Sequence, residues 1–154
     1  MEDKINISVA QKTDIPQLIP LLEILFTQEA DFRPDYNKQK IGLEMIIDNP
    51  DYGKNGHILI ATIDEKIVGM VNLIYTPSTV EGGKVVTLED MVINPDHRSF
   101  GIGTILLKHA IEFSRSQGHK RITLLTDFDN ERAMHVYTKL GFVKSNMIPL
   151  RLKL

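Results

Sequence analysis

The stretch Leu88-Glu-Asp-Met-Val-Ile-Asn-Pro-Asp-His-Arg-Ser-Phe-Gly-Ile-Gly-Thr104 is the most informative part of the chain. An apolar run ends at Asn94-Pro95, a short turn follows, and Gly101 and Gly103 open an amphipathic helix. The first backbone N–H groups of a helix have no partner within it, and the helix dipole makes that end attractive to anions. Because glycine has no Cβ, the phosphates of a ligand can approach the backbone closely. Residues 98 to 104 are therefore a candidate pyrophosphate site.

Length and composition indicate one ordinary globular domain. The 154 residues suit a single domain, over 1–154, with a core of its own. Hydrophobic residues make up 42% of the chain and charged residues 25%, as is typical of globular proteins. The net charge of −2 disfavours a nucleic-acid binder, since such domains are normally basic. The chain has no cysteine, which excludes disulfides, thiolate metal sites and a cysteine nucleophile.

The sequence also suggests where the protein works. No secretion signal is visible at the N-terminus, and Leu18–Phe26 is too short to cross a bilayer, which needs about 20 apolar residues. We therefore expect a cytoplasmic protein that contacts neither membrane nor nucleic acid. Histidines stand at positions 57, 97, 109, 119 and 135 without metal-ligand spacing, so we expect no metal.

Hydrophobic periodicity predicts the order of strands and helices. The expected strands are Ile5–Val9, His57–Ile63, Ile67–Thr76, Lys84–Ile93 and Lys120–Thr126, with one or two more in Phe142–Leu154. The expected helices are one that begins near Ile15, one over Lys38–Ile47 that stops before Asn49-Pro50, and those over Gly101–Gln117 and Asn130–Leu140. Short separators make the central strands antiparallel. We predict an α/β fold in which a mixed, mostly antiparallel sheet carries helices on both faces.

A second pattern lies downstream, where Asn130 is followed by Tyr137 and then by Gly141-Phe142. On a helix, Asn130 and Tyr137 share a face. Each pattern alone has an ordinary structural explanation. Two glycines occur in many strand–helix turns, and a tyrosine is usually a core aromatic with its hydroxyl at the surface. The glycine turn is not a dinucleotide fingerprint, because no third glycine follows at that spacing. The combination at this separation favours a functional explanation.

Together the two motifs resemble those of the GNAT superfamily of acyl-CoA-dependent N-acetyltransferases. The phosphate motif of that family, Gln/Arg-x-x-Gly-x-Gly/Ala, matches Arg98-Ser-Phe-Gly101-Ile-Gly103, and its second motif matches Asn130, Tyr137 and Gly141-Phe142. The order of elements also agrees, so the resemblance covers nearly the whole chain and implies a GNAT-like acyl-CoA N-acyltransferase fold. Ser99 and Phe100 stand where many members have glycine or a small basic residue. Contacts made by the backbone tolerate that difference.

The resemblance implies a site for acetyl-CoA as acyl donor. Backbone groups of Met91, Val92 and Ile93 would pair with the pantetheine arm, which Asn130 would also contact. The Tyr137 hydroxyl would lie beside the thioester sulfur and protonate the departing thiolate. The pyrophosphate would be held by the N–H groups of Arg98, Ser99, Phe100, Gly101, Ile102, Gly103 and Thr104.

Glu89 is the candidate general base. An alkylammonium has a pKa near 10.4 and attacks only after losing a proton, which a carboxylate can remove directly or through water. Strand alternation would place Glu89 on the same face as Met91 and Ile93. Alternatively, one of Glu89 and Asp90 is solvated and the other caps or pairs with a lysine. The tract Leu88-Glu89-Asp90 also resembles that of spermidine/spermine-type diamine acetyltransferases, which implies that Asp90 meets the amine.

Acidic residues elsewhere would suit a cationic acceptor. The candidates are Asp31, Tyr36 and Asp127, with Glu29, Asp35 and Asp129 nearby; a solvated loop is the alternative for each. The main hypothesis is direct acetyl transfer to a small-molecule amine in a ternary complex. A protein or peptide N-acetyltransferase and a non-catalytic acyl-CoA-binding module are the alternatives. Fold analogy also suggests a homodimer in which Ile148–Leu154 joins a partner's sheet.

Overall fold

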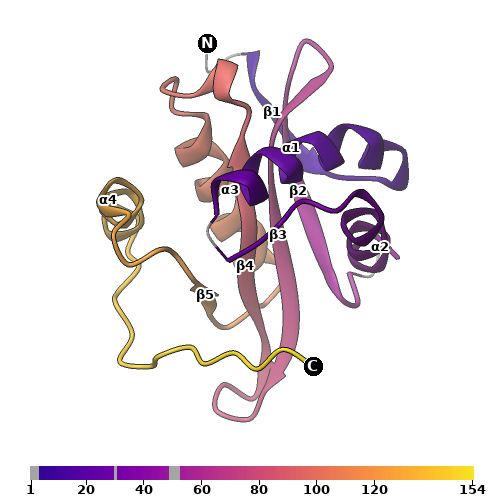
Figure 1. The fold of residues 1–154 in the computed structure, drawn as a ribbon. Coiled ribbons are helices and arrows are strands. Elements are labelled where there is room, and N and C mark those ends of the chain that lie inside the picture. Colours follow the sequence, from indigo (N-terminus) through magenta and orange to yellow (C-terminus); the bar gives the residue numbers. More distant parts are fainter. Residues whose placement is uncertain (1–3, 30, 49–52) are drawn as a thin grey trace.

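A five-stranded sheet in the order β1-β2-β3-β4-β5 forms the centre of the protein (Figure 1). The structure is a computed structural model and describes residues 4–29, 31–48 and 53–154. The strands are β1 (Asn6–Val9), β2 (Gly56–Ile63), β3 (Lys66–Ser78), β4 (Gly83–Ile93) and β5 (Ile122–Leu124). The first four are antiparallel, and β5 runs parallel to β4. This confirms the predicted mixed, mostly antiparallel sheet.

Helices cover both faces of the sheet, as predicted. They are α1 (Ile15–Gln28), α2 (Tyr36–Ile46), α3 (Ile102–Ser116) and α4 (Glu131–Lys139). On one face, α1 and α2 pack over Ile58 and Ile60. On the other face, α3 packs over Leu59, and α4 supplies partly buried apolar side chains. Successive residues of β2 thus enter opposite cores, which explains its nearly continuous apolar sequence. The expected stop before Asn49-Pro50 lies outside the described residues.

The C-terminal segment differs from the prediction. After Gly141 the chain contains neither strand nor helix, so the expected last strands are wrong. Alternating apolar residues favour a strand, but its backbone N–H and C=O groups need a partner edge, and this segment pairs with none in the chain described. Arg151 instead lies 3.4 Å from the Asp31 carboxylate and 5.3 Å from the centre of the Phe32 ring. Figure 1 shows the segment as the yellow trace that leads from α4 to the C-terminus.

A β-bulge interrupts β4 just before its last residues. Asn72 pairs with Glu89, and Met70 pairs with Val92, so two residues of β4 lie opposite one residue of β3. Asp90, within the bulge, has a left-handed backbone with a φ of 51°, which Asp and Asn tolerate better than most residues.

The bulge also changes which side chains share a face. Residues directly opposite each other in an antiparallel pair point to the same side, so Glu89 lies on the face of Asn72. Met91 and Ile93 pack instead into the core under α3. The prediction that Glu89 shares their face is therefore wrong, because strand alternation assumes a ladder without an extra residue.

Candidate active site

The turn between β4 and α3 leaves a run of backbone donors free. Ser99 and Gly101 adopt left-handed conformations, with φ values of 70° and 79°. The first backbone hydrogen bond of α3 runs from the N–H of Ile105 to the carbonyl of Gly101, at 3.1 Å. In the described part of the chain, the N–H groups of residues 99–104 have no backbone acceptor. The N–H of Arg98 donates to the carbonyl of Pro95 at 3.3 Å, so its prediction as a free donor is wrong. Successive free N–H groups at a turn before a helix form an anion-binding concavity.

The two glycines of the turn have different roles. A Cβ built on Gly101 would meet no atom within 4 Å, so the space beside this residue is open. Glycine is favoured here because the backbone is left-handed. A Cβ on Gly103 would lie 3.4 Å from Cε of Met91, so this glycine lets α3 begin against β4. The Nε of Arg98 donates to the carbonyl of Ile93 at 3.1 Å and ties the turn to the strand. The free donors and the open space fit a diphosphate.

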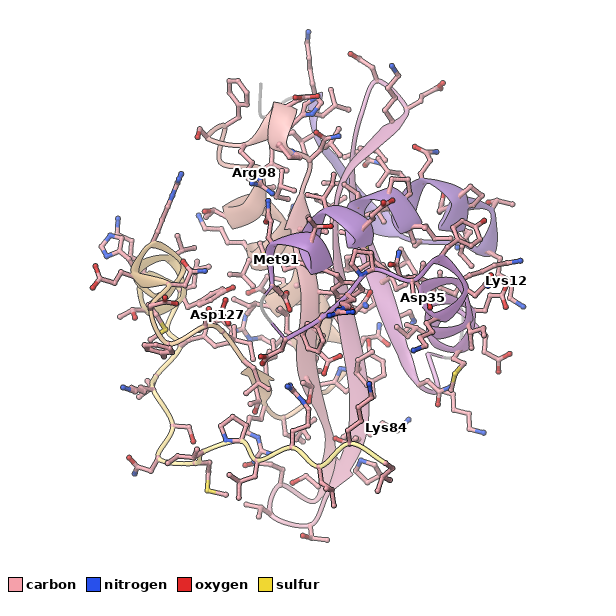
Figure 2. All side chains as sticks on the ribbon, in the orientation of Figure 1. Lys12, Asp35, Lys84, Met91, Arg98 and Asp127 are labelled. Carbon is pink, nitrogen blue, oxygen red and sulfur yellow. The ribbon has the colours of Figure 1, made fainter. Side chains whose placement is uncertain are left out.

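The edge of β4 beside this turn is open. β5 pairs with β4 only over Val86–Leu88, so the edge over residues 89–93 has no strand partner among the residues described. In the view of Figure 2, Met91 lies between Arg98 and Asp127 along this region. An unpaired strand edge offers N–H and C=O groups to an extended ligand. The predicted pantetheine and pyrophosphate residues are thus contiguous.

Tyr137 lies on the α3 side of the sheet, where it joins the same apolar cluster as Met91. Its ring packs edge-on against Phe142, with centroids 5.9 Å apart. Burial raises the pKa of the Tyr137 hydroxyl above its ordinary value, so the group keeps its proton throughout the neutral range. Such a hydroxyl can donate a proton to a leaving group.

Asn130 has a structural task that the sequence analysis did not assign. Its Oδ1 accepts a hydrogen bond from the N–H of Ala133 at 3.2 Å and so caps the N-terminus of α4. The cap fixes where α4 begins, and α4 carries Tyr137. The predicted contact of Asn130 with the pantetheine arm stays a prediction.

Carboxylates from separate segments come close together at the end of α1. Burial raises the pKa of Glu29, and the negative charges of Asp127 and Asp31 raise it further. Two of the predicted acceptor residues, Asp127 and Asp31, therefore lie near enough to Glu29 to raise its pKa, although they are far apart in the sequence. Repulsion among like charges would be relieved by a cationic ligand.

Asp90 lines a pocket of about 210 Å³ between α1, α2 and the sheet. Burial raises the pKa of Asp90 to about 6, with smaller contributions from the charges of Glu89 and Glu29. The side-chain amide of Asn72 donates to its Oδ2 at 2.9 Å and opposes that shift in the pKa. Glu89 itself is exposed. Sequence reasoning missed Asn72, whose signal was a single amide within the apolar run Ile67–Tyr75.

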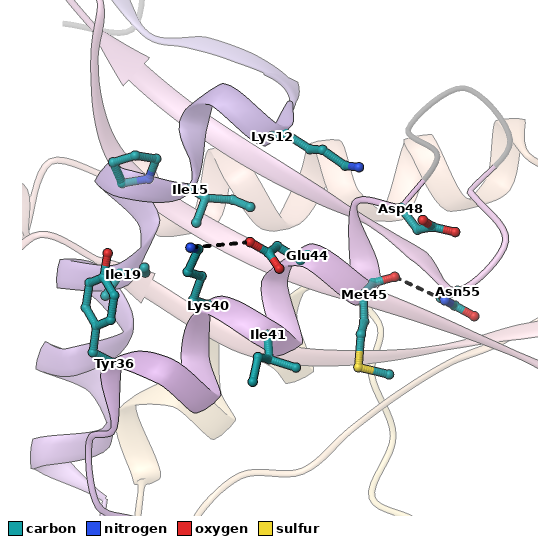
Figure 3. Close-up of a pocket in the computed structure, with 11 residues that line it drawn as sticks. Lys12, Ile15, Ile19, Tyr36, Lys40, Ile41, Glu44, Met45, Asp48 and Asn55 are labelled. Atoms are coloured by element: carbon teal, nitrogen blue, oxygen red, sulfur yellow. Dashed lines mark hydrogen bonds and ion pairs between the residues drawn. The ribbon is translucent and has the colours of Figure 1, made fainter.

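A larger groove of about 710 Å³ lies between the start of α1 and α2 (Figure 3). An ion pair joins Lys40 and Glu44 there at 3.8 Å, and Asn55 donates to the carbonyl of Met45 at 3.0 Å. Tyr36 is 62% exposed and lines this groove. It does not line the pocket of Asp90, so these two predicted acceptor residues belong to different hollows.

Two features are absent from residues 4–29, 31–48 and 53–154. In those ranges, no group of three or more histidine, aspartate or glutamate side chains is arranged to hold a metal ion. No helix within them is both long and apolar enough to span a membrane.

The mixed five-stranded sheet, with helices on both faces and a glycine turn before α3, is the fold of the GNAT acyltransferase class. Comparison of the sequence with protein families agrees: the profile of the acetyltransferase (GNAT) family matches residues 20–142, and the chain belongs to this family. Members of the family generally use acetyl-CoA.

Individual relatives support the same assignment. The chain is 28% identical over 137 residues to the N-acetyltransferase YhfO of Bacillus subtilis, a match that covers 89% of each chain. It is 36% identical over 78 residues to glucosamine 6-phosphate N-acetyltransferase of Trypanosoma brucei brucei, covering 50% of this chain and 51% of the relative. With several curated relatives the match spans only 30% to 51% of their length.

Solved structures show the same fold. An aminoglycoside acetyltransferase from an uncultured soil metagenomic sample, solved with sisomicin, superposes with a TM-score of 0.79. The superposition covers 99% of this chain and 98% of that one, at 18% sequence identity. At this identity the likeness establishes the fold alone.

Proposed function

We propose that the protein is an acetyl-CoA-dependent N-acetyltransferase that acetylates the primary amine of a small cationic acceptor. The observation that carries this proposal is the run of free N–H groups at residues 99–104 next to the open edge of β4. The carboxylates of Glu29 and Asp127 support a cationic acceptor, whereas Asp31 beside them already pairs with Arg151 at 3.4 Å. One relative is named for glucosamine 6-phosphate, and a protein of the same fold is named for an aminoglycoside; both compounds carry primary amines.

The residues that would hold the donor follow the order of the chain. The backbone of Met91, Val92 and Ile93 would pair with the pantetheine arm, the free N–H groups of residues 99–104 would bind the diphosphate, and Asn130 would contact the arm from α4. The thioester supplies an activated acyl carbon, to which the amine nitrogen bonds while the carbon–sulfur bond breaks.

The protons are handled by side chains of the protein. Asp90 holds the ammonium, and Glu89 takes a proton from it through water, because its own side chain is exposed. Tyr137 gives its hydroxyl proton to the departing sulfur, and the second proton that the nitrogen loses on becoming an amide returns to the Tyr137 oxygen. The chain has no cysteine, which supports direct transfer without an acyl-enzyme on a thiol. We further propose a homodimer that binds neither nucleic acid nor membrane.

A thiol-release screen with acetyl-CoA tests this function. Polyamines, alkylamines, aminoglycosides, amino acids and peptides would be offered to the wild-type protein, with mass spectrometry of the products. We expect acetylation of small cationic amines. Release with peptides alone would identify a peptide N-acetyltransferase instead, and coenzyme binding without release by any amine would identify a binding module.

A further inference from the structure

Asn72 is a polar side chain in the middle of the buried strand β3. It is 2% exposed, and its neighbours Val71 and Leu73 are fully buried. Its Nδ2 donates to Oδ2 of Asp90 at 2.9 Å. Because an ionised carboxylate only accepts hydrogen bonds, the amide atom that faces Asp90 must be the nitrogen, and the other atom of the amide is the oxygen. That oxygen is buried and has no hydrogen-bond partner in the described structure.

An acceptor of this kind requires an explanation. Burying a polar oxygen without a donor costs free energy, and nearly all such atoms in native proteins find a partner. The conformation and charge of Asp90, which faces Asn72, also cost free energy. Its backbone is left-handed, and Glu89 and Glu29 repel its negative charge. The amide oxygen of Asn72 and the carboxylate of Asp90 are thus neighbouring acceptors, and in the described structure neither receives a hydrogen bond from a positively charged group.

The pocket beside these two residues has a definite character. Leu22 and Phe26 from α1 and Leu43 and Ile46 from α2 form apolar walls. Its volume of about 210 Å³ corresponds to roughly seven groups the size of a water molecule.

The charged side chains of the same pocket limit what it can hold. Arg33 and Lys38 also line it, and the carboxylates of Asp35 and Asp90 balance their charge, so the pocket has no excess negative charge that would hold a second ammonium group. The space suits a short apolar body that carries one ammonium group.

We propose that Asn72 and Asp90 together bind the ammonium group of the acceptor, and that the adjoining apolar pocket holds the short chain that carries it. A primary ammonium has three N–H bonds. The Asn72 carbonyl accepts one and the Asp90 carboxylate a second, so the third is left for transfer to the base. The inference rests on the proposed function and specifies its acceptor as a primary amine on a short apolar chain.

Binding without chemistry tests this assignment. n-Butylammonium would be titrated into the protein loaded with coenzyme A, which carries no acetyl group, and followed by NMR chemical shifts. Asn72→Leu keeps the side-chain volume and removes the carbonyl, so we expect about a tenfold loss of affinity. Asn72→Ser retains a small acceptor and should bind with intermediate affinity. Ile60→Val changes the same face of the neighbouring strand and serves as the control, with unchanged affinity.

Two comparisons make the result specific. 1-Butanol, which has the same chain without the charge, should bind equally weakly to wild type and to Asn72→Leu. Thermal melts identify a variant that does not fold, and Asn72→Ser then decides. Equal n-butylammonium affinity in wild type and the Asn72 variants, or no binding to the wild type, would overturn the assignment. The proposed function fails separately, if the wild type releases no thiol with any amine.

Discussion

Asp90 holds a charge at a position where burial makes charge costly. Its pKa of about 6 exceeds the ordinary value of a carboxyl, mainly because of burial. A raised carboxyl pKa means that the folded state favours the protonated form. Asp90 therefore lowers stability as the pH rises from its ordinary pKa, near 3.9, through about 6. Above that range the full penalty applies.

Asp90→Asn should consequently raise the stability of the folded protein and weaken its binding of the acceptor. Asparagine adopts the left-handed backbone easily and carries no charge. We expect a gain of about 1 kcal/mol at about pH 7.5, or about 2–4 °C in Tm, together with a raised acceptor KM. Near pH 3 the gain should vanish, because wild-type Asp90 is then protonated in both states. Asp64→Asn, at an exposed left-handed position with a φ of 48°, is the matched control and should change neither quantity. An unchanged KM in Asp90→Asn would contradict the role in binding.

Tyr137→Phe tests the proton donor. Burial raises the pKa of the hydroxyl above its ordinary value of about 10, so ionisation of Tyr137 should not reduce wild-type turnover below that pH. The variant keeps the ring against Phe142 and should fold normally, while kcat falls by about 10²–10⁴. Tyr75→Phe is the control, since it removes a buried hydroxyl that bonds to His57 at 2.6 Å and should lower Tm without lowering kcat. Thiol release measured across the pH range decides, and equal turnover at every pH would exclude the donor role.

The β4–α3 turn needs glycine for its left-handed backbone. The same substitution at two such glycines separates an effect on protein stability from an effect on coenzyme A binding. Gly101→Val forces a β-branched residue into a φ of 79°, and Gly118→Val does the same at the other end of α3, where φ is 81°. Each should cost about 1–2 kcal/mol of stability. Only Gly101→Val should weaken coenzyme A binding, by roughly tenfold or more, because only its neighbouring N–H groups face the diphosphate. Equal coenzyme affinity in the two variants, measured by calorimetry, would refute the site.

Local periodicity predicted most helices and strands. It failed where the structure depends on pairing with a segment that is distant in the sequence. The runs over β2, β3 and β4 are long enough to show their strands, and the glycine turn indicated the start of α3. The bulge at Asp90 depends on how β4 pairs with β3, which no single strand reveals. For the same reason, the apolar run around Asn72 showed its burial and not its bond to Asp90, eighteen residues away. The contacts predicted between the backbone of β4 and its following turn and acetyl-CoA remain predictions.

At the scale of the whole molecule, β4 separates two environments of opposite charge preference. The free N–H groups of the turn lie where β4 leads into α3, and the carboxylates gather near the end of α1, which packs on the opposite face of the sheet from α3. An anionic donor and a cationic acceptor can therefore approach the same strand from different faces. This arrangement predicts that higher salt raises the acceptor KM, since screening weakens attraction at the exposed carboxylates.

The C-terminal segment carries the last prediction, which concerns the assembly of the molecule. Ile148, Leu150 and Leu152 recur at every second residue and are 82%, 94% and 84% exposed. Such a row of apolar side chains is a typical interaction surface, and its spacing suits strand addition to the sheet of a second copy. Light scattering should therefore find a dimer of the 17.5-kDa chain. The double variant Leu150→Lys/Leu152→Lys should be monomeric, whereas Val80→Lys, at an isolated residue that is 83% exposed, should remain dimeric. A monomeric wild type, or a dimer that survives both lysines, would contradict this assembly.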